Sequence, residues 1–206
     1  GPARGRGAAA APGIVPVRGP IGLRVGRRRA ASPDWYRKRK TLQRPTPAWS
    51  TPELETFRDQ VTRFFAEEIS PHMERWSKRG YIDRETWLKA GELGIALPDV
   101  PEEYGGGGGD FRHLAVVLEE GGYAAEAALG VAVHGIVAQY IVAYGSAAQK
   151  RRWLPRMTKG ELVGAIAMTE PGAGSDLQGI KTRAIRDDDS LVINGQKTFI
   201  TNGWHA

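Results

Sequence analysis

Cysteine is absent from this 206-residue sequence, and histidine is scarce. Without cysteine the chain forms no disulfide framework, no thiolate metal site and no cysteine nucleophile. The histidines stand far apart in the sequence, without the close spacing of metal ligands, so we predict no metal site. The four histidines are His72, His113, His134 and His205.

Acidic residues are nearly absent from the first 44 positions, which hold 12 lysines and arginines and a single acid, Asp34. The rest of the chain holds 17 basic and 22 acidic residues, so the net charge of +6 belongs to a basic tail on a mildly acidic remainder. Nucleic-acid binding would have to rest on that tail alone, and we predict no nucleic-acid partner.

Residues 1–49 also lack a periodic apolar pattern. Their composition, rich in glycine, alanine, proline and arginine, buries too little apolar surface to offset chain entropy, and it predicts a disordered basic leader. A mitochondrial transit segment would account for the arginines, but the few serines and many prolines favour an upstream translated leader. The chain also begins without methionine, so we expect a fragment, a processed product or a conceptual translation that lacks its true start.

Apolar residues recur at helical spacing between residues 50 and 160, which predicts an N-terminal all-α helical domain. Capping signals at Ser50, Asp110 and Ser146 mark expected helix starts. Gly94 and Gly145 mark expected ends. The expected apolar faces include Trp87, Leu88 and Leu93 in one helix, and Phe111, Leu114, Val117 and Leu118 in the next.

The mostly apolar stretch 127–144 is shorter than a typical membrane-spanning helix and contains His134 and Gln139. We predict a buried helix of the bundle there, and no membrane span. Five consecutive glycines, 105–109, predict a loop, because glycine is costly inside a regular element. A phosphate cradle lacks the lysine and serine or threonine of a P-loop, so a plain flexible connection is favoured.

From residue 161 the pattern changes to that of a β-domain. The continuous apolar run 162–168 predicts a strand buried on both faces. Asn194-Gly195, between the apolar segments 191–193 and 197–201, predicts a two-residue hairpin turn. The chain is therefore predicted to be α+β, with domains at 50–160 and 161–206.

The loop 169–176 separates the expected strand from the hairpin. Gly172 and Gly174 leave backbone amides uncovered, and Ser175 adds a hydroxyl, so the loop can hold an anionic or polar ring system. Many such loops bind nothing. Thr169, Thr201, Phe199 and Ile200 could be ordinary strand residues, and Ser175 a turn cap.

The complete strings raise the weight of the binding interpretation. Residues 168–176 with 179–182 closely resemble the first signature of the acyl-CoA dehydrogenases, and 193–197 with 199–203 resemble the second. The resemblance covers roughly residues 52–206, and 165–168 with 177–178 look most like the long-chain group. It implies an N-terminal helical bundle, the start of a β-barrel-like middle domain, and a missing C-terminal helical domain.

The resemblance also implies an activity. Members of the family oxidise a fatty acyl-CoA to the trans-2-enoyl-CoA in fatty acid β-oxidation, with FAD as cofactor. The carboxylate that removes the α-proton belongs to their C-terminal domain, so we expect no catalytic residue here and no activity from this chain alone. Expected partners are electron-transfer flavoprotein and further copies of the full-length chain. The expected compartment is the bacterial cytoplasm, or alternatively the mitochondrial matrix.

By the same resemblance, Thr169 would bond the pyrimidine side of the isoalloxazine and Thr201 the N5 region. Phe199 would cover one ring face, and Ser175 would also reach the CoA portion of the substrate. The cofactor-binding residues implied are Ile166, Ala167, Met168, Thr169, Gly174, Ser175, Phe199, Ile200 and Thr201. The alternatives are a flavin oxidase or monooxygenase on the same scaffold, or a non-catalytic binding module.

Overall fold

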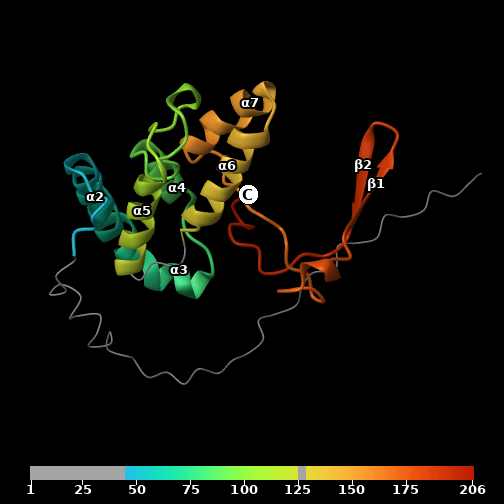
Figure 1. Cartoon of the computed structure of the whole chain (residues 1–206). Coiled ribbons are helices and arrows are strands. Elements are labelled where there is room, and N and C mark those ends of the chain that lie inside the picture. Colours follow the sequence, from blue (N-terminus) through green and yellow to red (C-terminus); the bar gives the residue numbers. More distant parts are fainter. Residues whose placement is uncertain (1–44, 125–128) are drawn as a thin grey trace, which may run out of the picture. The chain divides into compact units, whose positions relative to one another are not determined.

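The structure of the chain, a computed structural model, describes residues 45–124 and 129–206 (Figure 1). The basic leader predicted for residues 1–49 lies outside the described residues except for 45–49. Helices come first in the chain and a two-stranded antiparallel sheet follows, which confirms the predicted α+β class. We call residues 52–158 the helical body and residues 162–206 the motif segment.

In its described residues the helical body contains six α-helices, joined by shorter helical turns. The α-helices are α2 (Pro52–Phe64), α3 (Met73–Arg79), α4 (Arg84–Glu92), α5 (Phe111–Tyr123), α6 (Val131–Tyr144) and α7 (Ala147–Thr158). The π-helical turn η2 (Phe65–Ile69) continues α2. The 3-10 turns are η3 (Ser70–His72), η4 (Glu102–Tyr104) and η5 (Leu177–Gly179), the last in the motif segment. Among the helices of the described residues, none has the length and apolar character required to cross a bilayer.

Local capping chemistry sets where these helices begin. Asp110 and Ser146 cap α5 and α7 in complete capping boxes, as predicted. The prediction at Ser50 was wrong by one residue, because Thr51 is the N-cap of α2 and its hydroxyl accepts from the Leu54 amide at 3.3 Å. Ser50 instead donates its hydroxyl hydrogen to Glu55.

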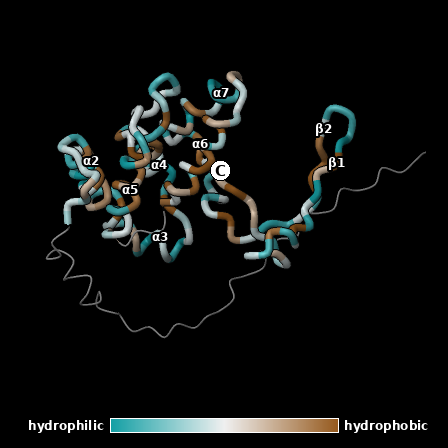
Figure 2. Tube along the Cα trace, in the orientation of Figure 1, coloured by the Kyte–Doolittle hydropathy of each residue, from teal (hydrophilic) through white to brown (hydrophobic). Residues whose placement is uncertain are grey.

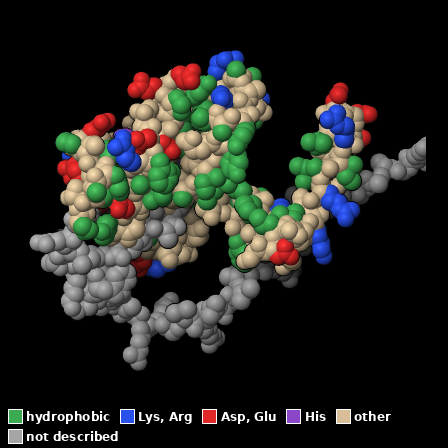
Figure 3. All heavy atoms as spheres, in the orientation of Figure 1, with side chains coloured by type: hydrophobic (Ala, Val, Ile, Leu, Met, Phe, Trp, Pro, Cys, Tyr) green, Lys and Arg blue, Asp and Glu red, His purple; other side chains and the backbone are tan. Residues whose placement is uncertain are grey.

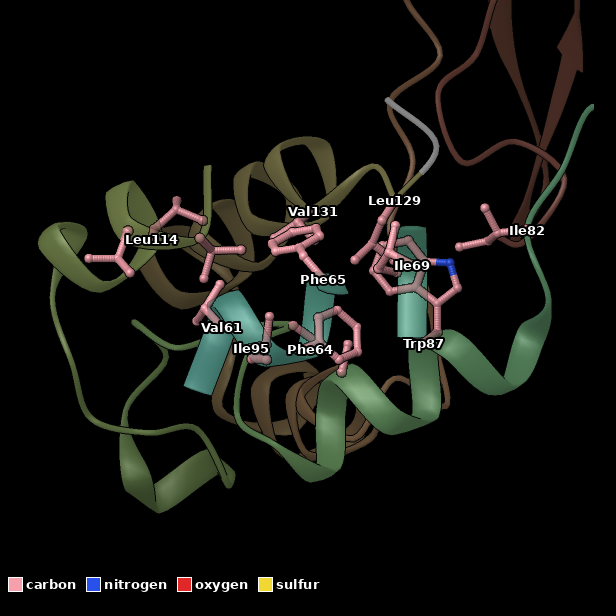
Figure 4. Packing of buried hydrophobic residues seen from close by; sticks show 14 of the residues in the cluster. Val61, Phe64, Phe65, Ile69, Ile82, Trp87, Ile95, Leu114, Leu129 and Val131 are labelled. Carbon is pink, nitrogen blue, oxygen red and sulfur yellow. The ribbon is translucent and has the colours of Figure 1, made fainter. Parts of the chain in front are cut away.

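A contiguous apolar core joins the first helices of the body (Figure 4). Phe64 and Phe65 are both buried at the point where α2 passes into the π-helical turn η2. Trp87 is fully buried and contributes roughly 2–3 kcal/mol by leaving water. Three residues expected on apolar faces are exposed instead, namely Leu88, Phe111 and Leu118.

A buried ion pair links α2 to α5. The Arg58 guanidinium donates to Glu120 at 3.0 Å and to Glu119 at 2.8 Å. Thr62 donates to the second oxygen of Glu120 at 2.9 Å, so this buried carboxylate is satisfied on both oxygens. The pairing explains how a charge can lie between two helices of the core.

Helix α6 is apolar over most of its circumference, as its largely brown tube in Figure 2 shows. Val131, His134 and Ala138 are buried against the other helices. Ile136 and Tyr140 are exposed, and hydrophobic side chains gather on this side of the body in Figure 3. The predicted buried helix is therefore confirmed for one face only.

The glycine run 105–109 is a loop, as predicted, but it is closely packed. The amides of Gly108 and Gly109 donate to the carbonyls of Val100 and Pro98 at 3.0 and 3.1 Å. A Cβ at Gly106 would lie 2.0 Å from the Val100 carbonyl oxygen. Glycine is required by this close approach of two backbones, and the interpretation as a plain flexible connection does not account for it.

The hairpin of the motif segment pairs β1 (Arg183–Asp187) with β2 (Ser190–Asn194). Its turn lies at Asp188 and Asp189, with Asp188 at a φ of 50°, which aspartate tolerates. The hairpin predicted across Asn194-Gly195 was therefore wrong. A Cβ at Gly195 would lie 2.1 Å from the Thr182 hydroxyl, so this glycine permits a close crossing and not a turn.

The strand predicted for residues 162–168 was also wrong. These residues form no strand among the described residues, and only Val163 and Gly164 are buried. Ala167 and Met168 are exposed. An apolar run indicates burial but does not supply a pairing partner, and here the polar groups of Gly164 bond to side chains instead.

Candidate functional site

The first signature folds into a tight turn closed by its own backbone. The amide of Glu170 donates to the carbonyl of Ala173 at 2.9 Å, and the Ala173 amide donates back at 3.1 Å. Pro171 and Gly172 form the tip of this turn. Ala173 and the side chain of Glu170 are buried below it, so the turn presents its backbone outward.

The Glu170 carboxylate fixes this turn to the following chain. It accepts from the amides of Lys181 at 2.8 Å and Thr182 at 2.9 Å, and it pairs with the Lys197 ammonium at 2.9 Å. Hydrogen bonds from Thr182, the Lys181 amide and the Lys197 ammonium lower the pKa of Glu170 to about 2. An acid this strong and this fully bonded serves as a structural acceptor at neutral pH and has no proton to exchange.

The two signatures meet along the chain segments that precede and follow the hairpin. The Thr198 amide donates to the Thr169 carbonyl at 3.0 Å. The Lys197 ammonium, besides pairing with Glu170, donates to the Met168 carbonyl at 2.9 Å. Residues 168–170 and 197–198 are therefore neighbours, although nearly thirty positions separate them in the sequence.

A second polar junction joins the motif segment to α6. Asn202 donates its side-chain amide to the carbonyls of Gly130 at 2.9 Å and Gly164 at 3.0 Å. The Gly164 amide donates to Nδ1 of His134 at 2.9 Å. Because Nδ1 accepts, the ring proton of the neutral imidazole sits on Nε2 and is donated to the Met157 carbonyl at 3.2 Å.

Burial keeps His134 neutral. The side chain is fully buried and packs edge-on against Trp87 at 5.2 Å between ring centroids. Desolvation lowers the pKa of His134 to about 4. Its two hydrogen bonds therefore persist at neutral pH.

The predicted cofactor residues lie largely on the surface. Phe199 is 90% exposed at a φ of 55°, and Met168 is 44% exposed. The other exposed members of the set are Ala167, Gly174, Ser175 and Thr201, and the partly exposed members are Ile166, Thr169 and Ile200.

The structure brings only some of these residues together. Met168 and Thr169 contact the second signature through the bonds to Lys197 and Thr198. Ile200 and Thr201 line a cleft of about 470 Å³, whose walls include no residue of 166–175. Among the described residues, no hydrogen bond joins Gly174 or Ser175 to 199–201.

The sequence did not predict the contacts of three residues that organise this region, namely His134, Lys197 and Asn202. Lys197 and Asn202 belong to the second signature, but their partners lie far away in the sequence. Only the position of His134 inside an apolar helix carried a signal, since a lone histidine in such a place needs hydrogen-bond partners.

The exposed members of the predicted set offer both apolar surface and polar groups. Met168 and Phe199 offer apolar surface, and Thr169 and Thr201 offer hydroxyls. A Cβ built on Gly172 or Gly174 would meet no atom within 4 Å, so the turn backbone is open to a ligand. An isoalloxazine needs this combination of apolar cover and polar contacts.

The fold and this region define a protein of the α+β class whose helical domain leads through a glycine-bearing turn into a β-domain. Known protein families match both parts of this architecture. Residues 51–161 match the acyl-CoA dehydrogenase N-terminal domain, and residues 165–206 match the acyl-CoA dehydrogenase middle domain. The chain therefore belongs to the acyl-CoA dehydrogenase family.

Individual relatives agree with this assignment. The chain is 48% identical over 153 residues to a mitochondrial long-chain specific acyl-CoA dehydrogenase of Sus scrofa, covering 74% of this chain and 36% of the relative. A crystal structure of acyl-CoA dehydrogenase from Geobacillus kaustophilus superposes with a TM-score of 0.75 at 46% identity, covering 78% of this chain and 43% of that one. An acyl-CoA dehydrogenase from Bacillus anthracis, solved with FAD, gives 0.69 at 33% identity, covering 79% and 28%.

The chain thus spans about a third of the length of the Sus scrofa enzyme. The activity, substrates and partners of a complete enzyme are accordingly matters for proposal.

Proposed function

We propose that this chain carries part of the FAD site of an acyl-CoA dehydrogenase. The observation that supports this most directly is the hydrogen bond of 3.0 Å from the Thr198 amide to the Thr169 carbonyl. It holds the two signatures side by side, as contact with a single ring system requires. The open turn backbone and the exposed Met168 and Phe199 side chains add the chemistry that such a ring needs.

The residues would divide the contacts among them. Thr169 would bond the pyrimidine edge of the isoalloxazine, with Ala167 and Met168 packed beside it. Thr201 would donate near N5, and Phe199 would cover one face. Ile166, Gly174, Ser175 and Ile200 complete the proposed set. FAD, when bound, supplies the two-electron chemistry that no side chain offers.

The proposed reaction is the oxidation of a fatty acyl-CoA to the trans-2-enoyl-CoA, as part of fatty acid metabolism. Ser175 would also contact the CoA portion of the substrate. Glu170, the buried carboxylate next to the signatures in the described residues, would not be the catalytic base, because it is fully bonded and ionised.

The remaining proposals concern the setting of the whole enzyme. Electrons would pass to electron-transfer flavoprotein, and the full-length protein would form a homo-oligomer. The compartment follows the source: cytoplasm in a bacterium, or mitochondrial matrix in a eukaryote.

Equilibrium titration with FAD tests the cofactor proposal. We expect the purified chain to quench flavin fluorescence saturably but to lose FAD on gel filtration. Thr169→Val and Thr201→Val each remove one hydroxyl at nearly constant shape, and each should weaken FAD binding roughly 2- to 10-fold, the worth of one hydrogen bond. The matched control is Thr56→Val at an exposed position of α2. Absence of quenching, or equal affinities in all three variants, would reject the proposal.

A second assay addresses the missing carboxylate. The chain, loaded with FAD and supplied with an acyl-CoA and an artificial electron acceptor, should show no turnover. Measurable enoyl-CoA formation would show that a catalytic base lies within residues 1–206.

A further inference from the structure

Asn202 occupies an unusual position beside the proposed flavin contact Thr201. Its φ of 65° lies in the left-handed region, which asparagine tolerates better than most residues. Its side-chain nitrogen donates to two carbonyls from different parts of the chain, Gly130 at 2.9 Å and Gly164 at 3.0 Å. A primary amide has two N–H groups, so both are used in this one bridge.

The Asn202 bridge brings the neighbouring residue Thr201 close to the backbone of Gly130. A Cβ built on Gly130 would lie 2.2 Å from the side-chain oxygen of Asn202 and 2.8 Å from the methyl carbon of Thr201. Only glycine at position 130 allows the two side chains to come so near to the backbone at the start of α6. The Thr201 methyl therefore packs against a fixed main-chain surface.

Gly164, the other end of the bridge, is fixed on both sides. Its carbonyl accepts from Asn202, and its amide donates to His134 of α6 at 2.9 Å. A Cβ at this position would lie 2.8 Å from Cβ of Val137, so it too is held close to α6. The proposed flavin-contacting residues 166–169 begin two positions after Gly164.

We propose that Asn202 is a positioning residue, which sets the Thr201 hydroxyl relative to residues 166–169 by tying both stretches to the start of α6. This inference rests on the proposed flavin function of Thr201 and adds a residue to it. Aspartate cannot replace Asn202 in this role, because a carboxylate would face two carbonyl oxygens with no hydrogen to donate. Glycine keeps the backbone conformation but removes the bridge.

Nuclear magnetic resonance on the full 206-residue chain tests the positioning without any cofactor. The wild-type chain should give a cross-relaxation signal between the Thr201 methyl and the α-protons of Gly130. Asn202→Asp and Asn202→Gly should both lose it, while the helical circular dichroism stays unchanged. The matched control Asn194→Asp, at the exposed end of β2, should keep it. Persistence of the signal in both Asn202 variants overturns the inference.

FAD titration provides the functional arm. Asn202→Asp and Asn202→Gly should weaken FAD binding roughly 10-fold, and adding Thr201→Val to either should cause little further loss, because residues that act through one another are not additive. Fully additive losses, or wild-type affinity in both variants, would reject the positioning role while leaving the flavin function intact. A wild-type chain that binds no FAD at all rejects the proposed function, and the inference with it.

Discussion

The helical body and the motif segment are held together by different kinds of interaction. The body buries large apolar side chains such as Trp76, Trp87 and Ile95 in a continuous core. In the motif segment the only buried residues, among 162–206, are Val163, Gly164, Glu170 and Ala173. Its strands are exposed along their whole length.

This difference separates the source of stability from the place of binding. Apolar burial stabilises the body in proportion to the area removed from water. The motif segment is fixed at a few polar points, chiefly Glu170 and Asn202, and leaves Met168 and Phe199 uncovered. A ligand-contacting segment needs such uncovered side chains, and the helical body supplies the surface to which it is tied.

The largest effect is expected from the ion pair inside the body. Glu120→Ala leaves the buried Arg58 guanidinium without its buried partner and should reduce the free energy of unfolding by about 3–5 kcal/mol. The control is Glu119→Ala, which removes a partner of the same arginine at 2.8 Å, but one whose side chain is 42% exposed. That loss should stay below about 1 kcal/mol in urea unfolding. Similar losses in both variants would mean that burial does not govern the pair.

The next effect is a pH dependence at His134. In the unfolded chain the histidine titrates near pH 6.5, whereas in the folded chain its pKa is lowered to about 4. The unfolded state therefore binds the proton first, and stability should fall by about 3 kcal/mol as the pH drops from about 6.5 to 4. Urea unfolding across this window measures it, and His134→Gln should flatten the curve. A wild-type curve that is already flat would contradict the buried neutral state.

A smaller, local effect is expected at Glu170. Glu170→Gln removes the charge that pairs with Lys197 and weakens the acceptor of the Lys181 and Thr182 amides. Hydrogen exchange at those two amides should accelerate several-fold while exchange in α2 and α5 stays unchanged. Asp176→Asn serves as control, because Asp176 also accepts a backbone amide but lies exposed. Acceleration throughout the body would show that the two regions unfold as one.

Local signals in the sequence were sufficient for the helix starts at Asp110 and Ser146, but not for the N-cap of α2 or for the exposed side chains of Leu88, Phe111 and Leu118. The caps at Asp110 and Ser146 were predictable because the side chain and the amide that it caps stand within three residues of each other. The hairpin was not, since Asn194-Gly195 favours a turn locally, whereas the close crossing at Thr182 depends on residues thirteen positions away. Such close approaches between residues distant in sequence cannot be predicted from local sequence patterns.

The same limit applies to the candidate site. The two signatures were recognisable as strings, so their membership in one site could be predicted from resemblance. The bridge from Asn202 to Gly130 spans 72 positions, and the contact from Lys197 to Met168 spans 29. The first depends on how the body places the motif segment and the second on how the motif segment folds back on itself, and no periodicity or spacing in the sequence encodes either.

The smallest effect is expected in the exposed hairpin of the motif segment, and it tests the comparison directly. Val192 of β2 is 45% exposed, and its replacement by threonine keeps shape while adding a hydroxyl that water can reach, so stability should change by less than about 0.5 kcal/mol. The same substitution at Val61, which is fully buried in α2, places a hydroxyl in the apolar core and should cost about 1–3 kcal/mol. Thermal and urea unfolding of the two variants give the contrast. If Val192→Thr lowered the free energy of unfolding as much as Val61→Thr, the hairpin would contribute to stability as the core does. The division between a stabilising body and a binding segment would then fail.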